Sequence, residues 1–182
     1  MVDMNQIFSS RIFLIGYMAA GKSTIGRALS EAIGYDFLDT DQAIKELNGQ
    51  MISELFQNKG EQYFRNEEQK ILKLTTDLNH IVVATGGGMP VTPSNMDLMN
   101  QSGTTVFIDT SLSTLIDRIS KNSTRPLHNN KKDLEDKVKA LYTRRLPYYG
   151  RAHITVTGDE TIEETVNLIR LQLSLVAQKK LP

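Results

Sequence analysis

Short, continuous runs of apolar and β-branched residues recur along the chain, and polar segments separate them. The runs cover residues 11–15, 81–84, 104–108 and 154–156, and a shorter one covers residues 35–38. Each run is continuous rather than alternating, which is typical of strands that are covered on both faces of a parallel sheet. The pattern therefore predicts a central sheet of five parallel strands.

The segments between these runs carry helix signals. Residues 22–33 place apolar side chains at helical spacing and end before Gly34, and Thr92 offers an N-cap before Pro93. Thr161 and Glu164 form a capping-box pair for a last helix. Strands that alternate with helices predict a three-layer α/β sandwich with ligands at the carboxyl ends of its strands. Since there is no internal repeat and no dividing linker, residues 1–182 are expected to form one domain.

The stretch from Gly16 to Ser23 reads G-x-x-x-x-G-K-[ST] and directly follows the first predicted strand. This is the P-loop pattern, in which backbone N–H groups cradle the phosphates of a nucleotide. Lys22 adds a positive charge, and the hydroxyl of Ser23 can bind Mg²⁺ at the start of the next helix. An unrelated glycine turn matches these four positions by chance only at roughly the per cent level. The context of strand before and helix after favours nucleotide binding further.

Composition excludes several other functions. The chain has 21 basic and 21 acidic residues, so no overall field favours nucleic acid or an anionic membrane. It has no cysteine, which excludes disulfides, thiolate metal sites and a cysteine nucleophile. Its three histidines are isolated, without metal-ligand spacing. No segment approaches the ~20 apolar residues of a membrane span, and no long apolar stripe is evident. A cytoplasmic protein is therefore expected, and nothing in the pattern opposes a monomer.

The triplet Asp39-Thr40-Asp41 follows the short second strand. Both carboxylates should therefore lie at the edge of the sheet that carries the P-loop. One could order Mg²⁺ or its waters, and the other could accept a hydrogen bond from an attacking hydroxyl. Helix capping explains the same residues equally well, because Asp and Thr favour a helix start.

Two further segments fit an acceptor site. Arg65 lies early on a predicted helix with Glu68 three residues later, where the carboxylate can hold a guanidinium that suits a planar carboxylate ligand. Gly86-Gly87-Gly88 follows the strand at 81–84, so a ligand could lie against backbone N–H groups there. A surface ion pair and a flexible turn are the alternatives.

A polar stretch at 121–133 has no apolar period and reads as a mobile lid, because a loop of that length in a compact domain is usually functional or disordered. Arg118, Lys121 and Arg125 lie in or near it, and the helix after it is expected to end at residues 144–147 with Arg144 and Arg145. Such charge runs are usually solvated faces. Their functional interpretation is closure over a transferring phosphoryl group.

Taken together, these motifs resemble the shikimate kinase family from Arg11 to at least Val156. The order includes Gly-Lys-Ser-Thr at 21–24, the Asp39 triplet, Phe64-Arg65 before Glu68, the triple glycine, Arg125-Pro126-Leu127, and Arg145 before Pro147-Tyr148-Tyr149. The resemblance implies a P-loop kinase fold with a lid. It also implies ATP-dependent phosphorylation of the 3-hydroxyl of shikimate to shikimate 3-phosphate, in aromatic amino acid (chorismate) biosynthesis. Mg²⁺ would be the cofactor, ATP the co-substrate and shikimate the small-molecule partner.

The resemblance also implies roles for single residues. Asp41 would hydrogen-bond the hydroxyl that is phosphorylated, and Asp39 would join Ser23 on the Mg²⁺ side. Arg65 and Arg145 would hold the shikimate carboxylate. Further acceptor-site residues would be Phe56, Phe64, Gly86, Gly87 and Gly88. The catalytic residues would be Lys22, Asp41 and Arg125, and the nucleotide would contact Gly16, Ala19, Ala20, Gly21, Lys22, Ser23, Thr24, Arg118 and Arg125. Whether Asp41 is a base or only orients the hydroxyl stays open.

Two motifs point elsewhere. Residues 106–109 have the form of a Walker B strand ending in Asp109, to which the resemblance gives no catalytic role, so we expect a structural or remote one. Residues 130–133 match the guanine-reading N-K-x-D pattern but follow polar residues rather than a buried strand, so we expect coincidence. The alternative functions are a P-loop kinase for another acceptor, such as gluconate or a nucleoside monophosphate, and a non-catalytic nucleotide switch.

Overall fold

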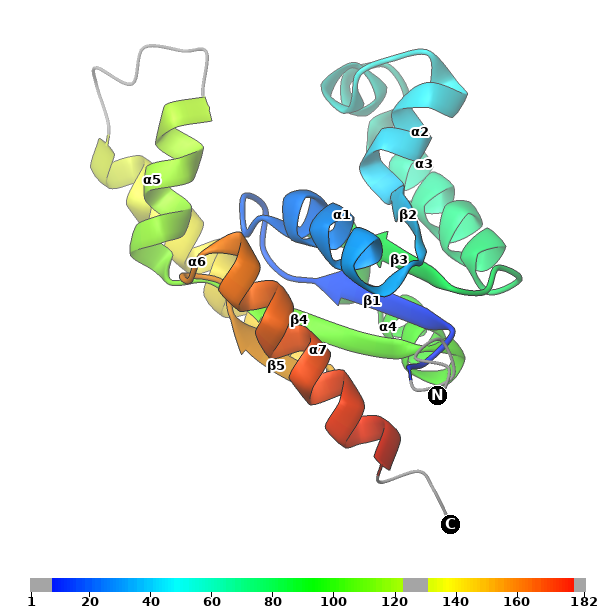
Figure 1. Ribbon diagram of the computed structural model, residues 1–182. Coiled ribbons are helices and arrows are strands. Elements are labelled where there is room, and N and C mark those ends of the chain that lie inside the picture. Colours follow the sequence, from blue (N-terminus) through cyan, green and yellow to red (C-terminus); the bar gives the residue numbers. More distant parts are fainter. Residues whose placement is uncertain (1–7, 123–130, 179–182) are drawn as a thin grey trace.

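Five parallel strands form the centre of the structure, in the order β2-β3-β1-β4-β5 (Figure 1). The computed structural model describes residues 8–122 and 131–178. At the centre of the sheet, Phe13 pairs with Val83 on one side and with Thr105 on the other. The five predicted strands are confirmed. The second strand begins and ends one residue later than expected. Their bounds are β1 (Arg11–Ile15), β2 (Asp36–Asp39), β3 (Ile81–Ala84), β4 (Thr104–Asp109) and β5 (Ile154–Thr157).

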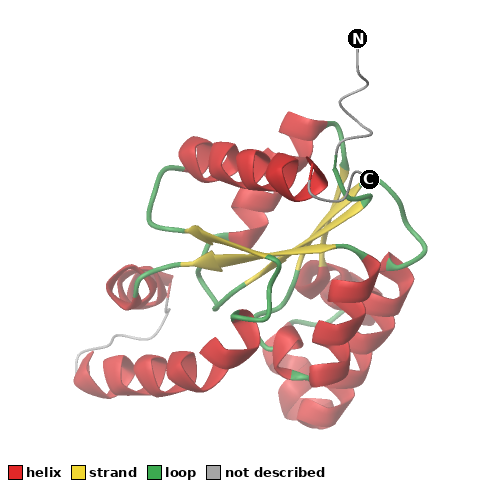
Figure 2. Ribbon diagram, turned by 90° about the horizontal axis from the view of Figure 1, so that it is seen from below, coloured by secondary structure: helices red, strands yellow, loops and turns green. Residues whose placement is uncertain are grey.

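Helices cover both faces of this sheet, as the two ribbon views show (Figures 1 and 2). Helices α1 and α7 pack together on one face, and α4 and α6 lie on the other. This is the predicted three-layer sandwich, and it explains why the central strands β1, β3 and β4 are buried on both faces. The edge strands differ, because β5 alternates buried and exposed residues and β2 is only partly buried. The described helices are α1 (Lys22–Ile33), α2 (Thr40–Asn48), α3 (Ile52–Thr75), α4 (Pro93–Ser102), α5 (Leu112–Asn122), α6 (Lys131–Tyr149) and α7 (Ile162–Gln178), with a 3₁₀ turn η2 (Met89–Val91).

Helix α3 consists of two helical halves that meet at Gly60. The glycine has φ 80° and ψ 169°, a conformation that is essentially restricted to glycine. Helices α2 and α3 stand beside the β2 edge of the sheet (Figure 1) and share a small core of their own. This core contains Ile44, Leu55, Phe64 and Ile71. The two helices are thereby packed against each other, and Leu72 of α3 also joins the main core.

Local signals at helix ends were mostly correct. Helix α1 ends at Gly34 in the left-handed conformation, and the Thr161–Glu164 capping box forms in both directions. Thr92 does occupy the N-cap position of α4, but its side chain makes no capping hydrogen bond. The expected function of that hydroxyl is therefore wrong. Pro93 at the first helical position, which needs no N–H partner, remains as the start signal.

The predicted limits of the polar loop at 121–133 are also wrong. Residues 121–122 complete α5 and residues 131–133 begin α6, while residues 123–130, including Arg125, lie outside the described part of the chain. Helix α6 then continues past Pro147 to Tyr149, where the N–H of Gly150 donates to the carbonyl of Leu146. A polar sequence without apolar period can still be helical where the helix end projects beyond the sheet.

Helix α7 exposes more apolar surface than the sequence suggested. Leu168, Leu171 and Leu175 are 36%, 55% and 44% exposed, and they lie on one face of the helix. These three leucines form a short exposed apolar stripe that the sequence pattern did not predict. Among residues 8–122 and 131–178, no helix is long and apolar enough to cross a bilayer.

Candidate active site

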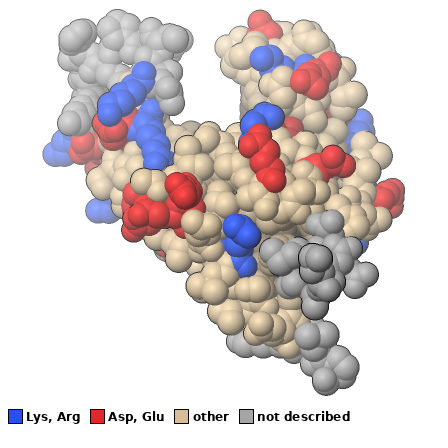
Figure 3. All heavy atoms as spheres, viewed as in Figure 1, with Lys and Arg blue, Asp and Glu red and all other residues tan. Residues whose placement is uncertain are grey.

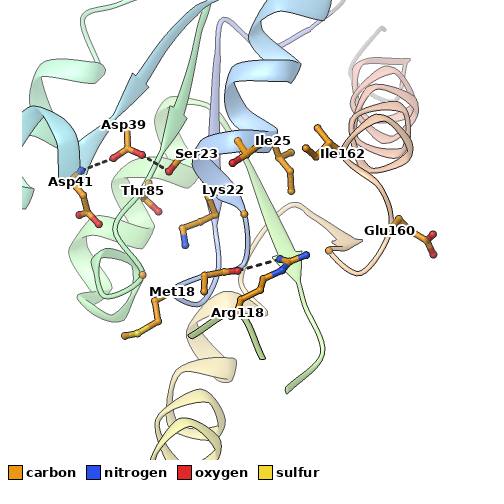
Figure 4. Close-up of a pocket in the computed structure, with 15 residues that line it drawn as sticks. Met18, Lys22, Ser23, Ile25, Asp39, Asp41, Thr85, Arg118, Glu160 and Ile162 are labelled. Carbon is orange, nitrogen blue, oxygen red and sulfur yellow. Dashed lines mark hydrogen bonds between the residues drawn. The ribbon is translucent and has the colours of Figure 1, made fainter. Parts of the chain in front are cut away.

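A cavity of about 520 Å³ opens at the carboxyl ends of the strands. Figure 3 shows the surface hollowed beside the side formed by α2 and α3. In Figure 4, Lys22 and Asp41 point towards the same space, and Arg118 lies farther along it. The lining residues are Met18, Ala19, Gly21, Lys22, Ser23, Thr24, Ile25, Asp39, Asp41, Thr85, Gly87, Arg118, Gly158, Glu160 and Ile162.

The loop from Gly16 to Gly21 requires the glycines at its two ends. Gly16 has φ 148°, and a Cβ there would lie 2.8 Å from the carbonyl oxygen of Ile108. Gly21 has φ 92° and caps α1, and Ala19 between them also has a positive φ, 62°. The loop therefore bends tightly around the start of α1, as binding of phosphates by backbone N–H groups and a helix N-terminus requires.

Lys22 is buried at the first position of α1. Its Nζ donates hydrogen bonds to the carbonyls of Gly16 and Tyr17, at 3.0 and 2.7 Å. Burial lowers the pKa of Lys22 to about 8, although the nearby carboxylates of Asp41 and Asp39 oppose this shift. An ammonium group that is partly desolvated and fixed by two carbonyls is suited to bind an anion strongly.

Ser23 and Asp39 form the oxygen-rich side of the cavity. The Ser23 hydroxyl donates to Asp39 Oδ2, and Asp39 Oδ1 accepts from the backbone N–H groups of Asp41 and Gln42 at 3.0 and 3.1 Å. Asp39 is therefore the N-cap of α2, so the helix-capping interpretation of the triplet is confirmed for this residue, and the magnesium interpretation stays a prediction. A hydroxyl and a carboxylate are hard oxygen donors that suit Mg²⁺, which takes only one or two protein ligands and completes its shell with water and phosphate. These two residues fit a magnesium ion.

Asp41 and Glu68 bring two carboxylates together beside Gly86. A Cβ on Gly86 would lie 2.5 Å from Asp41 Oδ1 and 2.9 Å from Glu68 Oε1, and neither oxygen has a hydrogen-bond partner among the described residues. Burial and the neighbouring Asp39 carboxylate raise the pKa of Asp41, against the effect of Lys22 and Arg65. Burial also raises the pKa of Glu68. Buried acceptors without partners point to a ligand with hydroxyl groups.

Arg65 is held on α3 by two carboxylates. Its Nη1 donates to Glu68 at 2.6 Å and its Nη2 to Glu61 at 3.0 Å, and the guanidinium lies directly on Gly88, where a Cβ would come within 2.5 Å of Nη1. Phe64 is buried beside it, with the ring of Phe56 at 4.8 Å. Phe56 itself is 36% exposed. The guanidinium is therefore fixed next to the glycine loop and does not form only a surface ion pair.

Arg145 approaches the same loop from α6. Its Nη1 donates to the carbonyl of Gly87 at 3.3 Å, and its guanidinium lies 5.7 Å from the ring centroid of Tyr17. Tyr149 donates to the same carbonyl at 2.7 Å. The neighbouring Arg144 is exposed, as is Lys121 of α5, so the solvated-face interpretation is correct for these two residues.

Arg118 marks the other end of the cavity. Its Nη1 donates to the carbonyl of Ala19 at 3.2 Å, so α5 is tied to the P-loop. Ile25, Gly158, Glu160 and Ile162 line this end as well, and none of these four was predicted. They belong to α1, to the segment between β5 and α7, and to the first residue of α7, which meet only in the folded chain.

The structure thus brings most predicted site residues to one edge. Ala19, Gly21, Lys22, Ser23, Thr24, Asp39, Asp41, Gly87 and Arg118 line the cavity. The acceptor side of the cavity adjoins Phe64, Arg65, Gly86, Gly88 and Arg145. Gly16 begins the P-loop, and Ala20 within it is buried with its carbonyl facing Thr110.

Thr40 was not proposed for the site, yet its hydroxyl accepts the N–H of Gly86 at 2.9 Å and thereby fixes the glycine loop. Lys131 to Asp133, from the N-K-x-D match, begin α6, and Asn130 lies outside the described residues.

A P-loop at the edge of a parallel sheet, with carboxylates and arginines on the same cavity, defines the class of P-loop kinases that phosphorylate a small acceptor. A model of the shikimate kinase family matches residues 18–174. The shikimate kinase of Legionella pneumophila (strain Corby) is 43% identical over 160 residues, covering 87% of this chain and 91% of the relative. The chain belongs to the shikimate kinase family.

Solved structures agree with this assignment. The shikimate kinase of Bacteroides thetaiotaomicron superposes with a TM-score of 0.85 at 33% identity, over 91% of this chain and 98% of the other. That of Acinetobacter baumannii, solved in complex with shikimate, gives 0.82 at 33% identity, over 95% and 96%. A gluconokinase from Sinorhizobium meliloti gives 0.63 at 18% identity over 94% and 95%, which is a likeness of fold alone.

Proposed function

We propose that the reaction of this chain, the ATP-dependent phosphorylation of shikimate, takes place in the cavity at the carboxyl ends of the strands, and that the 3-hydroxyl is the acceptor. One observation carries the proposal: Lys22 of the P-loop and Asp41 of α2 line the same cavity. The phosphoryl donor and the hydroxyl acceptor can therefore meet without a carrier. In this arrangement catalysis consists of positioning the acceptor and stabilising charge.

On the nucleotide side, the P-loop N–H groups and Lys22 bind the phosphates, and Arg118 binds near the adenine. Arg125 is proposed to reach the transferring phosphoryl group, although it lies outside the described residues. Ser23 and Asp39 would hold Mg²⁺, Ser23 directly and Asp39 directly or through water. The ion, when bound, neutralises phosphate charge, and the residues keep it on the side of the cavity opposite Arg118.

On the acceptor side, Asp41 accepts the hydrogen bond of the attacking hydroxyl. Its raised pKa makes it a stronger proton acceptor than an ordinary aspartate while it is ionised, so the carboxylate can take the hydroxyl proton during transfer. Arg65 and Arg145 bind the shikimate carboxylate from two different helices, and Gly86 to Gly88 leave room for the ring against the backbone. Phe64 and Phe56 supply an apolar wall.

Release of ADP with different acceptors tests this assignment. We expect turnover with shikimate, and rates at least a hundredfold lower with gluconate or AMP, because neither presents a ring carboxylate to Arg65 and Arg145 together with a hydroxyl to Asp41. Preference for gluconate or AMP would support the alternative kinase. Nucleotide binding without turnover on any acceptor would support the nucleotide switch. The single-domain organisation, the monomeric state and the cytoplasmic location stay predictions.

A further inference from the structure

Asp109, the last residue of β4, is an acidic residue at the strand ends to which the proposed function gives no role. It completes a sequence of Walker B form, yet it is not among the residues that line the cavity. Its Oδ1 accepts a hydrogen bond of 2.6 Å from the hydroxyl of Tyr142 on α6. The residue is therefore engaged by a helix rather than directed at the nucleotide.

Tyr142 also contacts the P-loop. The edge of its ring packs on Tyr17, with the ring centroids 5.8 Å apart and the planes at 62°. The guanidinium of Arg145 lies over the same Tyr17 ring at 5.7 Å. Tyr142 and Arg145 are three residues apart on α6 and so share one face of the helix. A single aromatic ring of the P-loop thus contacts both.

Four residues after Arg145, Tyr149 makes the same two kinds of contact as Tyr142, a hydrogen bond from its hydroxyl and a packing contact of its ring. Its hydroxyl donates to the carbonyl of Gly87 at 2.7 Å, and its ring packs against Phe107 of β4 with the centroids 5.2 Å apart. Arg145 therefore lies between two tyrosines, one with its hydroxyl bound to the end of β4 and the other with its hydroxyl bound to the glycine loop after β3. The rotation of α6 about its own axis decides where the guanidinium points, and these two hydroxyl groups fix that rotation.

We propose that Asp109 and Tyr142 are positioning residues for the acceptor site: their hydrogen bond holds α6 in the rotation that directs Arg145 to Gly87 and to the acceptor carboxylate. The proposal rests on the proposed role of Arg145. A bond from a phenol to a carboxylate is charge-assisted and stronger than a neutral one. Burial and Asp109 raise the pKa of Tyr142 well above its ordinary value, so the donor proton is retained throughout the neutral range.

The test is Tyr142→Phe, which keeps the ring on Tyr17 and removes only the hydroxyl. We expect KM for shikimate to rise roughly three- to tenfold, the range expected for one hydrogen bond. KM for ATP and kcat should stay within about twofold, since Lys22 and Asp41 are untouched. Asp109→Asn keeps an acceptor oxygen for Tyr142 but removes its charge, so KM for shikimate should rise less than in Tyr142→Phe, and the double variant should match Tyr142→Phe alone, because both changes act on one interaction.

Tyr35→Phe is the matched control. Tyr35 lies just before β2, at the opposite edge of the sheet, and its buried hydroxyl has no hydrogen-bond partner among the described residues. Its loss should leave both KM values unchanged. An unchanged KM for shikimate in Tyr142→Phe, or an equal rise in both KM values, would overturn the proposal. So would an Asp109→Asn variant that needs more Mg²⁺ while its KM for shikimate stays normal, because Asp109 would then serve the metal.

Amide hydrogen exchange of residues 141–149 gives a readout that needs no substrate. Exchange there should be faster in Tyr142→Phe and in Asp109→Asn than in the wild type, and unchanged in Tyr35→Phe. Equal exchange in all four proteins would overturn the proposal. A wild-type protein that did not phosphorylate shikimate would overturn the proposed function, whereas the exchange rates would still decide whether Asp109 and Tyr142 hold α6.

Discussion

At the scale of single residues, the acceptor side of the cavity contains buried carboxylates that lower the stability of the fold and serve its function. Asp41 Oδ1 is buried without a hydrogen-bond partner among the described residues, close to the unpartnered oxygen of Glu68. Asp41→Asn should lower turnover by roughly 10²- to 10⁴-fold, the range for loss of a proton acceptor. It should also raise the Tm by about 2–4 °C, because removal of one such buried charge is worth about 1 kcal/mol.

The pH dependence of that gain follows from the direction of the pKa shift. The pKa of Asp41 is raised in the folded state, so the ionised form costs stability once the pH rises through that pKa, and nothing is lost below the ordinary pKa of an aspartate. The gain in Asp41→Asn should therefore be full at neutral pH and vanish near pH 3. Asp36→Asn, at an exposed position at the start of β2, is the control and should change neither turnover nor Tm. A variant that turns over normally would remove Asp41 from the mechanism.

Lys22 gives a second prediction at this scale. Burial lowers the pKa of Lys22 to about 8 in the free protein, so the ammonium loses its proton as the pH rises through that value. We expect kcat/KM for ATP, which reports ionisations of the free enzyme, to fall about tenfold per pH unit above pH 8. Lys22→Arg stays charged, so it should be slower overall but lack this alkaline limb. A wild-type profile that stays level to pH 9.5 would contradict the assignment.

At the scale of elements, the break in α3 is the feature that places Arg65 and Glu68. Gly60 has φ 80° and ψ 169°, and a Cβ there would meet no atom within 4 Å. Gly60→Ala therefore tests the backbone alone. Such strain costs about 1–3 kcal/mol, so the Tm should fall by roughly 3–10 °C, and KM for shikimate should rise because Arg65 follows the break directly.

Gly150→Ala is the comparison for that substitution. Gly150 ends α6 without a positive φ, and its nearest added contact would be an ordinary 3.5 Å to the carbonyl of Leu146. The change should be close to neutral in both Tm and KM. If Gly60→Ala were equally neutral, the two halves of α3 would not depend on the glycine conformation, and another feature would have to set the direction of Arg65.

The elements also show which features the sequence could predict. Strands and α1 depend on local apolar runs and glycines, so their bounds were predicted to within a residue or two. The P-loop, Asp39 to Asp41 and Arg65 with Glu68 are local motifs as well. The contacts that complete the site join distant positions: Gly86 to Thr40 across 46 residues and Tyr142 to Asp109 across 33. No periodicity or spacing contains such pairs, because they arise only when the strands align in register.

At the scale of the whole molecule, the open question is whether the exposed face of α7 joins two copies. Leu168, Leu171 and Leu175 form an apolar stripe on a helix whose other face packs on α1 and β5. Three partly exposed side chains supply only a fraction of the ~800 Å² per partner that a stable interface buries. Acidic and basic residues balance, so net charge gives neither strong repulsion nor attraction between copies.

We therefore expect sedimentation velocity at micromolar concentration to show one species near the chain mass of 20.4 kDa. Leu171→Gln should sediment identically and retain full activity, since the stripe lies outside the cavity lining. A species of twice the mass that disappears in Leu171→Gln would contradict the monomer and assign the stripe to self-association.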